Sequence, residues 1–382
     1  MDVLLNFLPL KSGGGLQVGL DFLEHAQRAS AQHRWFLVAS EGTPLAHRRG
    51  ASSVQVSKVV SRSTGARLWF ETVGCRELLR RHRPAVIYTQ FGTQWPGAAD
   101  RVNVVGCAYS NLCYPEIDFW QRLPTPQRQW RQARDRLRRR RVQQADAVIF
   151  ETEDLAERGI HHLGLKPDRV HVVRASASTL VGPESRHLET AQRCETLPQG
   201  FRVLLLSVYH PNKNFEMLPR VAHALRQRAG DEDTVFIVTL PTQSSHWRDL
   251  AARASALGVA DRLFNFGPVP QEGCAELYRA CDAVILPSQL ESFSNTIAEA
   301  WTLGRPLLTS DLPWARGLCA DAAAYFEYDS ANAAAERLCE LRSDAAHREQ
   351  LVEAGYRQLM RYPSSAQRFA GYMSILEQHA ER

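Results

Sequence analysis

The sequence predicts a two-domain α/β protein in which each domain is built on a doubly wound parallel sheet. Short apolar runs rich in β-branched residues alternate with segments of helical periodicity, which is typical of parallel sheets covered by helices. A second series of this kind starts at Phe201, after a stretch without clear periodicity at 176–200. The length of 382 residues suits two domains. We expect them at 1–190 and 191–363, with a last helix at 364–382 that packs back on the first.

The composition excludes several classes of protein. With 44% hydrophobic and 23% charged residues, the chain is globular and not disordered. No apolar run reaches the length of a membrane-spanning helix. The eight cysteines form no C-x-x-C pair, so we expect neither a zinc site nor a disulfide framework, and a cytoplasmic location. Residues 1–200 hold 28 Lys and Arg against 19 Asp and Glu, so only this half is expected to attract acidic partners.

The first domain is expected to open with a strand at 3–10, a glycine loop at 12–19 and a helix at 20–31. Gly13 and Gly15 have the G-x-G spacing of a dinucleotide fingerprint, but Val18 stands where its third glycine belongs, so the match is weak. Further strands are expected at 35–40, 85–90, 102–109, 147–150 and 170–173, and helices at 71–82 and 153–163.

Polar residues follow the ends of two of these strands. Gln90 and Thr93 come after one, and Tyr109, Ser110 and Asn111 after another. The carboxyl ends of parallel strands share one edge of the sheet, where ligands bind in open α/β folds. We therefore expect these side chains either to line a ligand site or to serve only as turn and cap residues.

The most basic segment, 128–142, is expected to be an amphipathic helix. Trp130, Ala133 and Leu137 recur at helical spacing, and arginines cover most of the remaining surface, among them Arg138, Arg139, Arg140 and Arg141. Three interpretations remain open. In the first, the arginines form a solvated helix face. In the second, the helix contacts anionic lipid headgroups or the diphosphate of a lipid-linked acceptor. In the third, it binds nucleic acid, an interpretation that only its positive charge supports.

The second domain repeats the strand–loop–helix pattern. A strand at 201–208 leads to His210, Lys213 and Asn214, and a helix is expected from Phe215 with Asn214 as its N-cap. A cation at the positive end of a helix dipole is poorly placed unless an anion binds beside it. Lys213 is therefore a candidate phosphate ligand. After the strand at 262–267, Val269 lies in a proline turn and is a candidate backbone contact to a ligand.

The segment 281–311 organises this domain. A buried strand at 282–286 is followed by a polar loop, a short helix from Thr296 that Gly304 closes, and a strand at 307–309. The N–H groups of Ser294, Asn295 and Thr296 suit a phosphate. The carboxylate of Glu299 could accept hydrogen bonds from a ribose diol. Glu291, eight positions earlier, could face a sugar. Alternatively, Thr296 and Glu299 form a capping box and Glu291 is only solvated.

Several spaced motifs resemble the donor-binding half of the family-4 retaining glycosyltransferases. They are Phe266-Gly-Pro-Val, 277–288 (LYRACDAVILPS), Glu291-Ser-Phe with Glu299-Ala, Gly304-Arg-Pro and Thr309-Ser-Asp. The pair Glu291 and Glu299 matches the E-x7-E signature of that family. The resemblance implies a GT-B fold, in which two Rossmann-like domains face each other across a cleft. The cluster at 308–316 resembles transferases of surface-polysaccharide pathways such as O-antigen assembly.

The resemblance also implies roles for residues. Glu291, Lys213 and Asn111 would be catalytic, and the donor would contact Glu299, Ser294, Asn295, Thr296, Phe293, Val269, His210, Gly14 and Gly15. The acceptor or membrane would contact Trp130 and Arg138 to Arg141. The chain departs from the family pattern at Val208, where an arginine is usual, and at Ser110, near which a histidine is usual. The second phosphate cation would then either be missing or be supplied elsewhere, by His210 or Arg174.

The expected reaction is transfer of a sugar, with retention, from a nucleotide-diphosphate sugar to a saccharide or lipid-linked saccharide. No D-x-D motif stands where a metal–diphosphate site would lie, so we expect no metal and no other cofactor. Two alternatives remain. One is a sugar-nucleotide epimerase of the same architecture. The other is a non-catalytic subunit that binds sugar nucleotides. If the basic helix binds lipid, the protein would lie on the inner face of the cytoplasmic membrane; nucleic acid is not an expected partner.

Overall fold

The computed structural model describes residues 1–29, 33–47, 54–177, 180–228 and 233–381. The chain divides into two compact units. The N-terminal unit comprises Met1–Ser176 together with Pro363–Arg382, and the C-terminal unit comprises Ala177–Tyr362. The boundary lies before the position 190 that was expected, because the expected linker contains a helix, α7 (Leu188–Cys194), that belongs to the C-terminal unit.

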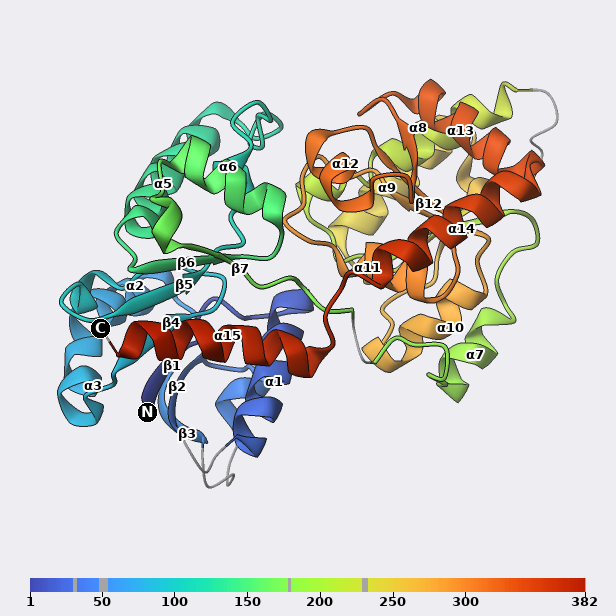
Figure 1. The fold of residues 1–382 in the computed structure, drawn as a ribbon. Coiled ribbons are helices and arrows are strands. Elements are labelled where there is room, and N and C mark those ends of the chain that lie inside the picture. Colours follow the sequence, from blue (N-terminus) through green and yellow to red (C-terminus); the bar gives the residue numbers. More distant parts are fainter. Residues whose placement is uncertain (30–32, 48–53, 178–179, 229–232, 382) are drawn as a thin grey trace. The chain divides into compact units, whose positions relative to one another are not determined.

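The N-terminal unit has a seven-stranded parallel sheet in the order β3-β2-β1-β4-β5-β6-β7 (Figure 1). Its strands are β1 (Asp2–Asn6), β2 (Arg34–Ser40), β3 (Val54–Val60), β4 (Val86–Thr89), β5 (Asn103–Gly106), β6 (Ala147–Phe150) and β7 (Val170–Val172). The edge strand β3 was not predicted. Its alternation is partly masked because Ser57 and Lys58 fall at a register shift opposite Leu37 and Val38 of β2.

The helices of this unit are α1 (Gly13–Arg28), α2 (Thr64–Trp69), α3 (Cys75–His82), α4 (Ser110–Cys113), α5 (Thr125–Gln143), α6 (Glu153–Leu163) and α15 (Ser365–Ala380). A π-helical turn, Phe70–Gly74, joins α2 to α3, so the predicted helix at 71–82 starts earlier than expected. The predicted glycine loop is wrong. Gly14 and Gly15 form the first turn of α1, which begins at Gly13.

Two apolar cores lie on opposite faces of this sheet. On one face, Phe22 of α1 and Leu376 of α15 pack with Leu5 and Leu37 of the sheet. On the other face, Leu78 of α3 packs with Leu4 of β1. Leu4 directly precedes Leu5, and successive side chains of a strand point to opposite faces of the sheet. The C-terminal helix α15 thus supplies part of the core of the N-terminal unit (Figure 1).

The C-terminal unit has a six-stranded parallel sheet in the order β10-β9-β8-β11-β12-β13. Its strands are β8 (Arg202–Leu205), β9 (Val235–Val238), β10 (Leu263–Asn265), β11 (Ala283–Leu286), β12 (Leu307–Ser310) and β13 (Ala324–Phe326). The remaining helices are α8 (Met217–Arg226), α9 (Ser245–Ala256), α10 (Cys274–Arg279), α11 (Asn295–Thr302), α12 (Pro313–Cys319), α13 (Ala331–Ser343) and α14 (Ala345–Leu359). Helices α8, α9 and α13 contribute to one continuous core with the sheet.

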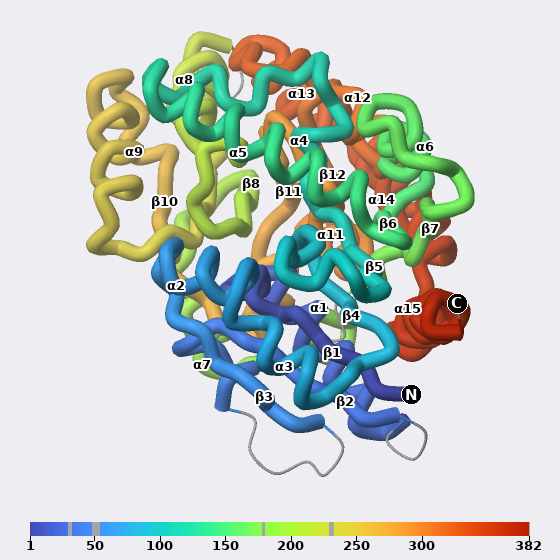
Figure 2. Tube along the Cα trace, turned by 90° about the vertical axis from the view of Figure 1, so that its left-hand side faces the viewer, coloured from blue at the N-terminus to red at the C-terminus, as the bar shows by residue number. Residues whose placement is uncertain are grey.

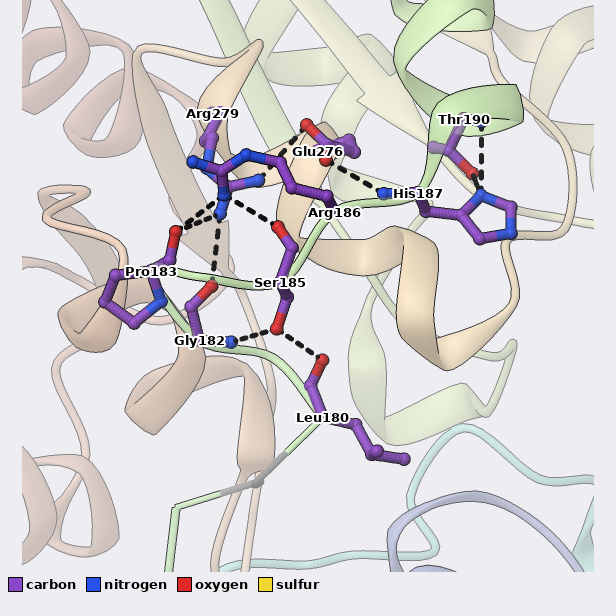
Figure 3. Close-up of polar contacts among 9 residues, drawn as sticks. All are labelled: Leu180, Gly182, Pro183, Ser185, Arg186, His187, Thr190, Glu276 and Arg279. Atoms are coloured by element: carbon purple, nitrogen blue, oxygen red, sulfur yellow. Dashed lines mark hydrogen bonds and ion pairs between the residues drawn. The ribbon is translucent and has the colours of Figure 1, made fainter.

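The segment that enters the C-terminal unit is held on α10 (Figure 3). The Arg279 guanidinium donates to the carbonyl oxygens of Gly182 and Pro183, at 3.1 and 2.8 Å. On the same helix, Glu276 accepts a hydrogen bond from the backbone N–H of His187 at 3.1 Å. The segment therefore follows a defined path along α10 before α7 begins.

Each sheet has the strand order of a doubly wound nucleotide-binding fold. In the N-terminal unit the order reverses between β1 and β4, and in the C-terminal unit between β8 and β11. Ligands of open α/β sheets bind outside the carboxyl ends of the strands at such switch points. The loops after β8 and β11 are therefore the first place to look for a site in the C-terminal unit.

Candidate functional site

The two loops at the switch point of the C-terminal unit are tied to each other. The backbone N–H of Gln289 donates to the carbonyl oxygen of Asn212 at 2.7 Å. The Asn212 side-chain amide donates in return to the Leu290 carbonyl oxygen at 2.7 Å. One residue further along each loop, Lys213 Nζ lies 2.6 Å from Glu291 Oε1. The hydrogen bonds thus place these two charged side chains together.

Lys213 and Glu291 form a nearly buried ion pair, with side-chain exposures of 16% and 8%. An ammonium and a carboxylate removed from water are costly unless they stay paired. Because the pair lies at the carboxyl ends of β8 and β11, a ligand at the switch point would meet both charges. A phosphate would compete with Glu291 for Lys213, and a sugar hydroxyl would donate to Glu291.

The expected N-cap role of Asn214 is wrong. Asn214 has a left-handed backbone with φ of 53°, which Asn tolerates better than most residues, and it ends the short 3-10 helix Pro211–Lys213. Helix α8 begins only at Met217. Lys213 is thus held by the turn and by Glu291. It does not sit at the positive end of a long helix.

Helix α11 begins beside this pair. Its N-cap is Ser294, whose side chain makes no capping hydrogen bond. Among the described residues, no group accepts a hydrogen bond from the backbone N–H of Ser294, Asn295 or Thr296. The Thr296 hydroxyl donates to the Leu206 carbonyl oxygen after β8, at 3.1 Å, and so ties α11 to the first loop. The start of α11 therefore presents three backbone donors at the switch point to which Lys213 also belongs.

Glu299 lies about one turn into α11 and is only 5% exposed. Its Oε2 accepts a hydrogen bond from the Tyr278 hydroxyl of α10 at 2.9 Å. The capping box considered from the sequence does not form, because Ser294 and not Thr296 is the N-cap. Burial raises the pKa of the Glu299 carboxyl to about 7, and the Tyr278 hydrogen bond opposes that rise. The other oxygen of Glu299 accepts no hydrogen bond from the residues that the structure describes, so this buried carboxylate suits a ligand that donates hydrogen bonds.

The other predicted donor residues are divided between the two units: three lie in the C-terminal unit and two in the N-terminal unit. Phe293 precedes the N-cap of α11, and its ring lies 5.7 Å from that of Tyr362. His210 is the N-cap of the 3-10 helix that ends at Lys213, and it is exposed. Val269 lies in the loop after β10 and is partly buried. Gly14 and Gly15 belong to the N-terminal unit, in the first turn of α1. Val208, where an arginine was expected, is 71% exposed.

In the N-terminal unit, Asn111 lies in α4 directly after β5. Its amide donates to Asp135 Oδ2 of α5 at 2.7 Å. Asp135 also accepts from Trp120 Nε1, at 2.7 Å, and from Arg138, at 2.9 Å. Arg174 is paired with Glu153 in the same unit. The structure therefore gives Asn111 a positioning partner, Asp135, that the sequence did not single out.

Helix α5 forms as predicted, but two of its apolar residues, Trp130 and Leu137, are exposed, whereas Val142 is buried. Trp130 and Leu137 are 56% and 47% exposed, whereas the charged Asp135 is 8% exposed. The reason is that the polar face has partners: Arg138 stacks on the Tyr109 ring at 4.4 Å, and Arg141 pairs with Glu71 at 3.5 Å. Arg139 and Arg140 are both exposed, and Arg139 donates to the His162 carbonyl oxygen.

Sequence reasoning missed Tyr278, Asn212 and Asp135. Each acts on a partner distant in the chain, so no local pattern predicts the contact. Tyr278 carries one signal, since it stands on a helix of otherwise apolar buried residues, where a hydroxyl needs a partner. No group of three or more His, Cys, Asp or Glu that could hold a metal ion occurs among the described residues. Nor does any described helix have the length and apolar character that crossing a membrane requires.

Two family models match the chain. "Glycosyltransferase Family 4" matches residues 13–175, and "Glycosyl transferases group 1" matches residues 195–358. The chain carries one glycosyltransferase domain of each kind. The sites described above fall accordingly: Lys213, Glu291 and Glu299 within the group 1 domain, and Asn111 and α5 within the family 4 domain.

Curated relatives align with part of this chain. The D-inositol 3-phosphate glycosyltransferase of Salinispora tropica is 33% identical over 180 residues, which is 44% of this chain and 37% of the relative. The protein of the same name from Thermomonospora curvata is 30% identical over 230 residues, 56% of this chain and 52% of the relative. The aligned part thus spans between a third and about half of the length of these relatives.

Solved structures match the whole chain in fold. The Anabaena protein HepE, in complex with UDP and glucose, has a TM-score of 0.73 at 16% identity, covering 98% of this chain and 99% of that one. WaaG, a glycosyltransferase involved in lipopolysaccharide biosynthesis, has a TM-score of 0.69 at 16% identity, covering 100% and 99%. At such identities the likeness shows the fold, which is GT-B: two Rossmann-like domains with parallel sheets.

Proposed function

We propose that the protein is a retaining glycosyltransferase that takes its sugar from a nucleotide-diphosphate sugar. The observation that carries the proposal is the grouping of Lys213, Glu291, Glu299 and the three backbone donors that open α11, all around one switch point. Cationic and amide donors suit a diphosphate, and a buried carboxylate suits a diol. We assign the donor to the C-terminal unit and the acceptor to the N-terminal unit.

In the proposed mechanism the ribose diol donates to Glu299, and the diphosphate accepts hydrogen bonds from the N–H groups of Ser294 to Thr296. The bond between the anomeric carbon and the diphosphate oxygen breaks while the acceptor oxygen bonds to the same carbon. The acceptor proton passes to the leaving phosphate on the same face of the sugar. Lys213 and the α11 amides stabilise the charge that develops on the diphosphate, so the step is written without a metal.

Two acceptor classes follow from what the chain is similar to. The resemblance of residues 308–316 to surface-polysaccharide transferases supports a saccharide or lipid-linked saccharide acceptor, as in lipopolysaccharide assembly. The name of the curated relatives makes D-inositol 3-phosphate the second acceptor to examine. HepE was solved with UDP and glucose, which makes UDP-glucose the first donor to examine.

The test is to incubate the protein with a panel of nucleotide sugars, with and without each acceptor, and to measure nucleoside diphosphate and product. Acceptor-dependent release of nucleoside diphosphate with an α-linked product from an α-linked donor supports the proposal. An epimerised sugar nucleotide without an acceptor would instead identify the sugar-nucleotide epimerase. Binding of nucleotide sugars without turnover in any combination would identify a non-catalytic subunit.

Donor affinity is expected to fall as the pH falls through the pKa of Glu299, near 7. The ionised carboxylate accepts both hydrogen bonds of a ribose diol, whereas the protonated acid has lost one acceptor site. UDP-glucose is a suitable probe because its diphosphate has no proton to lose in this range. Calorimetry should show about tenfold weaker binding at pH 6 than at pH 8. The Glu299→Gln variant should bind weakly and equally at both; a pH dependence that survives this substitution would contradict the assignment.

We also propose that the outward face of α5 contacts an anionic membrane, which would place the protein at the inner face of the cytoplasmic membrane. Trp130, Ala133 and Leu137 form an exposed apolar row on this helix, with Arg136 and Arg140 beside it. An amphipathic helix with aromatic and basic residues on its exposed side is suited to the interface of a bilayer. Each basic residue near an anionic surface adds about 1 kcal/mol.

The double variant Trp130→Ser/Leu137→Ser is expected to bind acidic vesicles about tenfold more weakly than the wild type, because it removes the apolar part of the contact. Co-sedimentation with vesicles of phosphatidylglycerol measures this. A control is Met360→Ser, which changes another exposed apolar residue, at the end of α14 in the C-terminal unit. If acidic vesicles retain the wild type no better than neutral ones, the membrane proposal is wrong.

A further inference from the structure

A pocket of about 480 Å³ lies in the N-terminal unit. Its lining residues come from α4, from the segment that follows α4 up to Trp120, and from one face of α5. Figure 2 shows the course of the backbone through α4 and α5. The α5 side chains in the wall are Gln132, Asp135, Arg136 and Arg139, which recur at helical spacing. This face differs from the outward row of Trp130 and Leu137.

The pocket has a fixed floor. Asp135 lines it, is 8% exposed, and holds Asn111 and Trp120 by hydrogen bonds of 2.7 Å each. Both of these partners line the pocket as well. A buried carboxylate that accepts hydrogen bonds from two neighbouring elements fixes the orientation of both side chains. The indole and the amide are therefore positioned before any ligand arrives.

The charges of the lining leave an excess of positive charge. Each of the two carboxylates in the wall is already paired with an arginine that is not part of it: Asp118 with Arg128, and Asp135 with Arg138. The lining arginines are Arg136 and Arg139, and Arg139 donates to the His162 carbonyl oxygen. No described residue makes an ion pair or hydrogen bond with the Arg136 guanidinium, and Arg136 is an exposed residue that lines the pocket.

Neighbouring arginines outside the lining add to this positive charge. Arg131 lies over the Trp120 ring at 5.1 Å, and Arg138 lies over the Tyr109 ring at 4.4 Å. Burial, together with the charges of Arg138 and Arg131, lowers the pKa of Arg134 to about 10. Several cations are thus held close together around one buried carboxylate, an arrangement that an anionic ligand would stabilise.

The remaining lining indicates what carries the negative charge. The rings of Phe119 and Trp120 meet edge to face, with centroids 4.6 Å apart, and both line the pocket with the amides of Asn111 and Gln132. Aromatic faces pack against the C–H face of a sugar, and amides donate to and accept from its hydroxyls. An aliphatic or purely ionic ligand would leave these groups unused.

We propose that this pocket binds a saccharide that carries a phosphate or carboxylate group, with Arg136 and Arg139 on the charged group and Trp120, Asn111 and Gln132 on the sugar. The proposal rests on the proposed function, because it makes the pocket the acceptor-binding site and gives the acceptor a negative charge. The volume fits a monosaccharide phosphate, since ligand pockets run from about 300 to 1,000 Å³.

The test is calorimetric titration of the full-length protein with glucose, glucose 6-phosphate, glucuronate and inorganic phosphate. Glucose 6-phosphate or glucuronate is expected to bind at least tenfold more tightly than glucose and than inorganic phosphate. Whichever of these two compounds binds more tightly shows whether the pocket recognises a phosphate or a carboxylate group. Equal binding of all four compounds, no binding at all, or a preference for inorganic phosphate alone would overturn the proposal.

A matched pair of variants locates the binding. Arg136→Ala is expected to weaken binding of the preferred compound about tenfold, whereas Arg80→Ala, an exposed arginine of α3 outside the pocket lining, should leave it unchanged. Equal losses in both variants would reduce the effect to general charge attraction and overturn the proposal. Binding of UDP-glucose, measured in parallel, should be the same in both. If UDP-glucose does not bind even to the wild type, the proposed function is wrong. The titration with glucose, glucose 6-phosphate, glucuronate and inorganic phosphate still tests the pocket separately.

Discussion

Replacing Glu299 with alanine is expected to weaken the binding of UDP by about 100-fold. The wild-type carboxylate is 5% exposed and has an oxygen that Tyr278 does not use. Hydrogen bonds to a charged group contribute about 1.5–3 kcal/mol each, so the loss of a ribose diol contact gives an effect of this size. Calorimetry with UDP measures it directly, and thermal shift with UDP, GDP, dTDP and ADP gives the base preference.

Two controls separate binding from folding in this prediction. Glu151→Gln changes another buried carboxylate, which pairs with Arg368 in the N-terminal unit at 2.8 Å, and should leave UDP affinity unchanged. Tyr278→Phe removes the hydroxyl partner of Glu299 and keeps the ring, so it should alter UDP affinity less than Glu299→Ala does. UDP affinity equal to the wild type in a folded Glu299→Ala protein would contradict the ribose contact.

Replacing Glu291 with glutamine is expected to lower kcat by 10²–10³ with a small change in KM for the donor. Glu291 is the partner of Lys213 at 2.6 Å and is proposed to face the transferred sugar. Removing its charge changes the electrostatic environment where the sugar–phosphate bond breaks, and single groups of this kind are typically worth about 10²–10³ in rate. Initial rates of nucleoside diphosphate release over a range of donor concentrations separate kcat from KM.

The Glu291 variant needs its own control because it leaves Lys213 nearly buried without its partner. Breaking such a pair destabilises a protein by about 3–5 kcal/mol, so the thermal midpoint must be measured beside the rate. Glu353→Gln, an exposed carboxylate of α14, should change neither rate nor midpoint. A Glu291→Gln protein that is folded and retains the wild-type kcat would show that Glu291 is a structural partner of Lys213 only.

The sheets could be predicted because their signals are local. The run Ala283–Leu286 is apolar and buried throughout, as strands covered on both faces must be. The places of Glu291 and Glu299 could be predicted from the same pattern. Glu291 lies in the loop after this strand, and Glu299 lies in the short, buried helix that follows the loop. Strand β3 was missed because it is an edge strand in which Ser57 and Lys58 interrupt the alternation at the register shift.

The orientation of α5 could not be predicted, because it depends on partners distant in the sequence. Hydrophobic periodicity places Trp130 and Leu137 on one face but does not say which face is covered. Asp135 decides it, through hydrogen bonds to Asn111 and Trp120 that lie 24 and 15 positions away. The left-handed Asn214 was missed for a related reason, since its turn is set by the contacts between the loops after β8 and β11.

The central claim is that a diphosphate is bound where α11 begins, between Lys213 and Glu299. The structure of the protein with UDP-glucose bound tests it most directly. We expect diphosphate oxygens within hydrogen-bond distance of the N–H groups of Ser294 to Thr296, with both ribose hydroxyls on the Glu299 carboxylate. Diphosphate oxygens bound elsewhere in the C-terminal unit, with Glu299 still contacting only Tyr278, would contradict it.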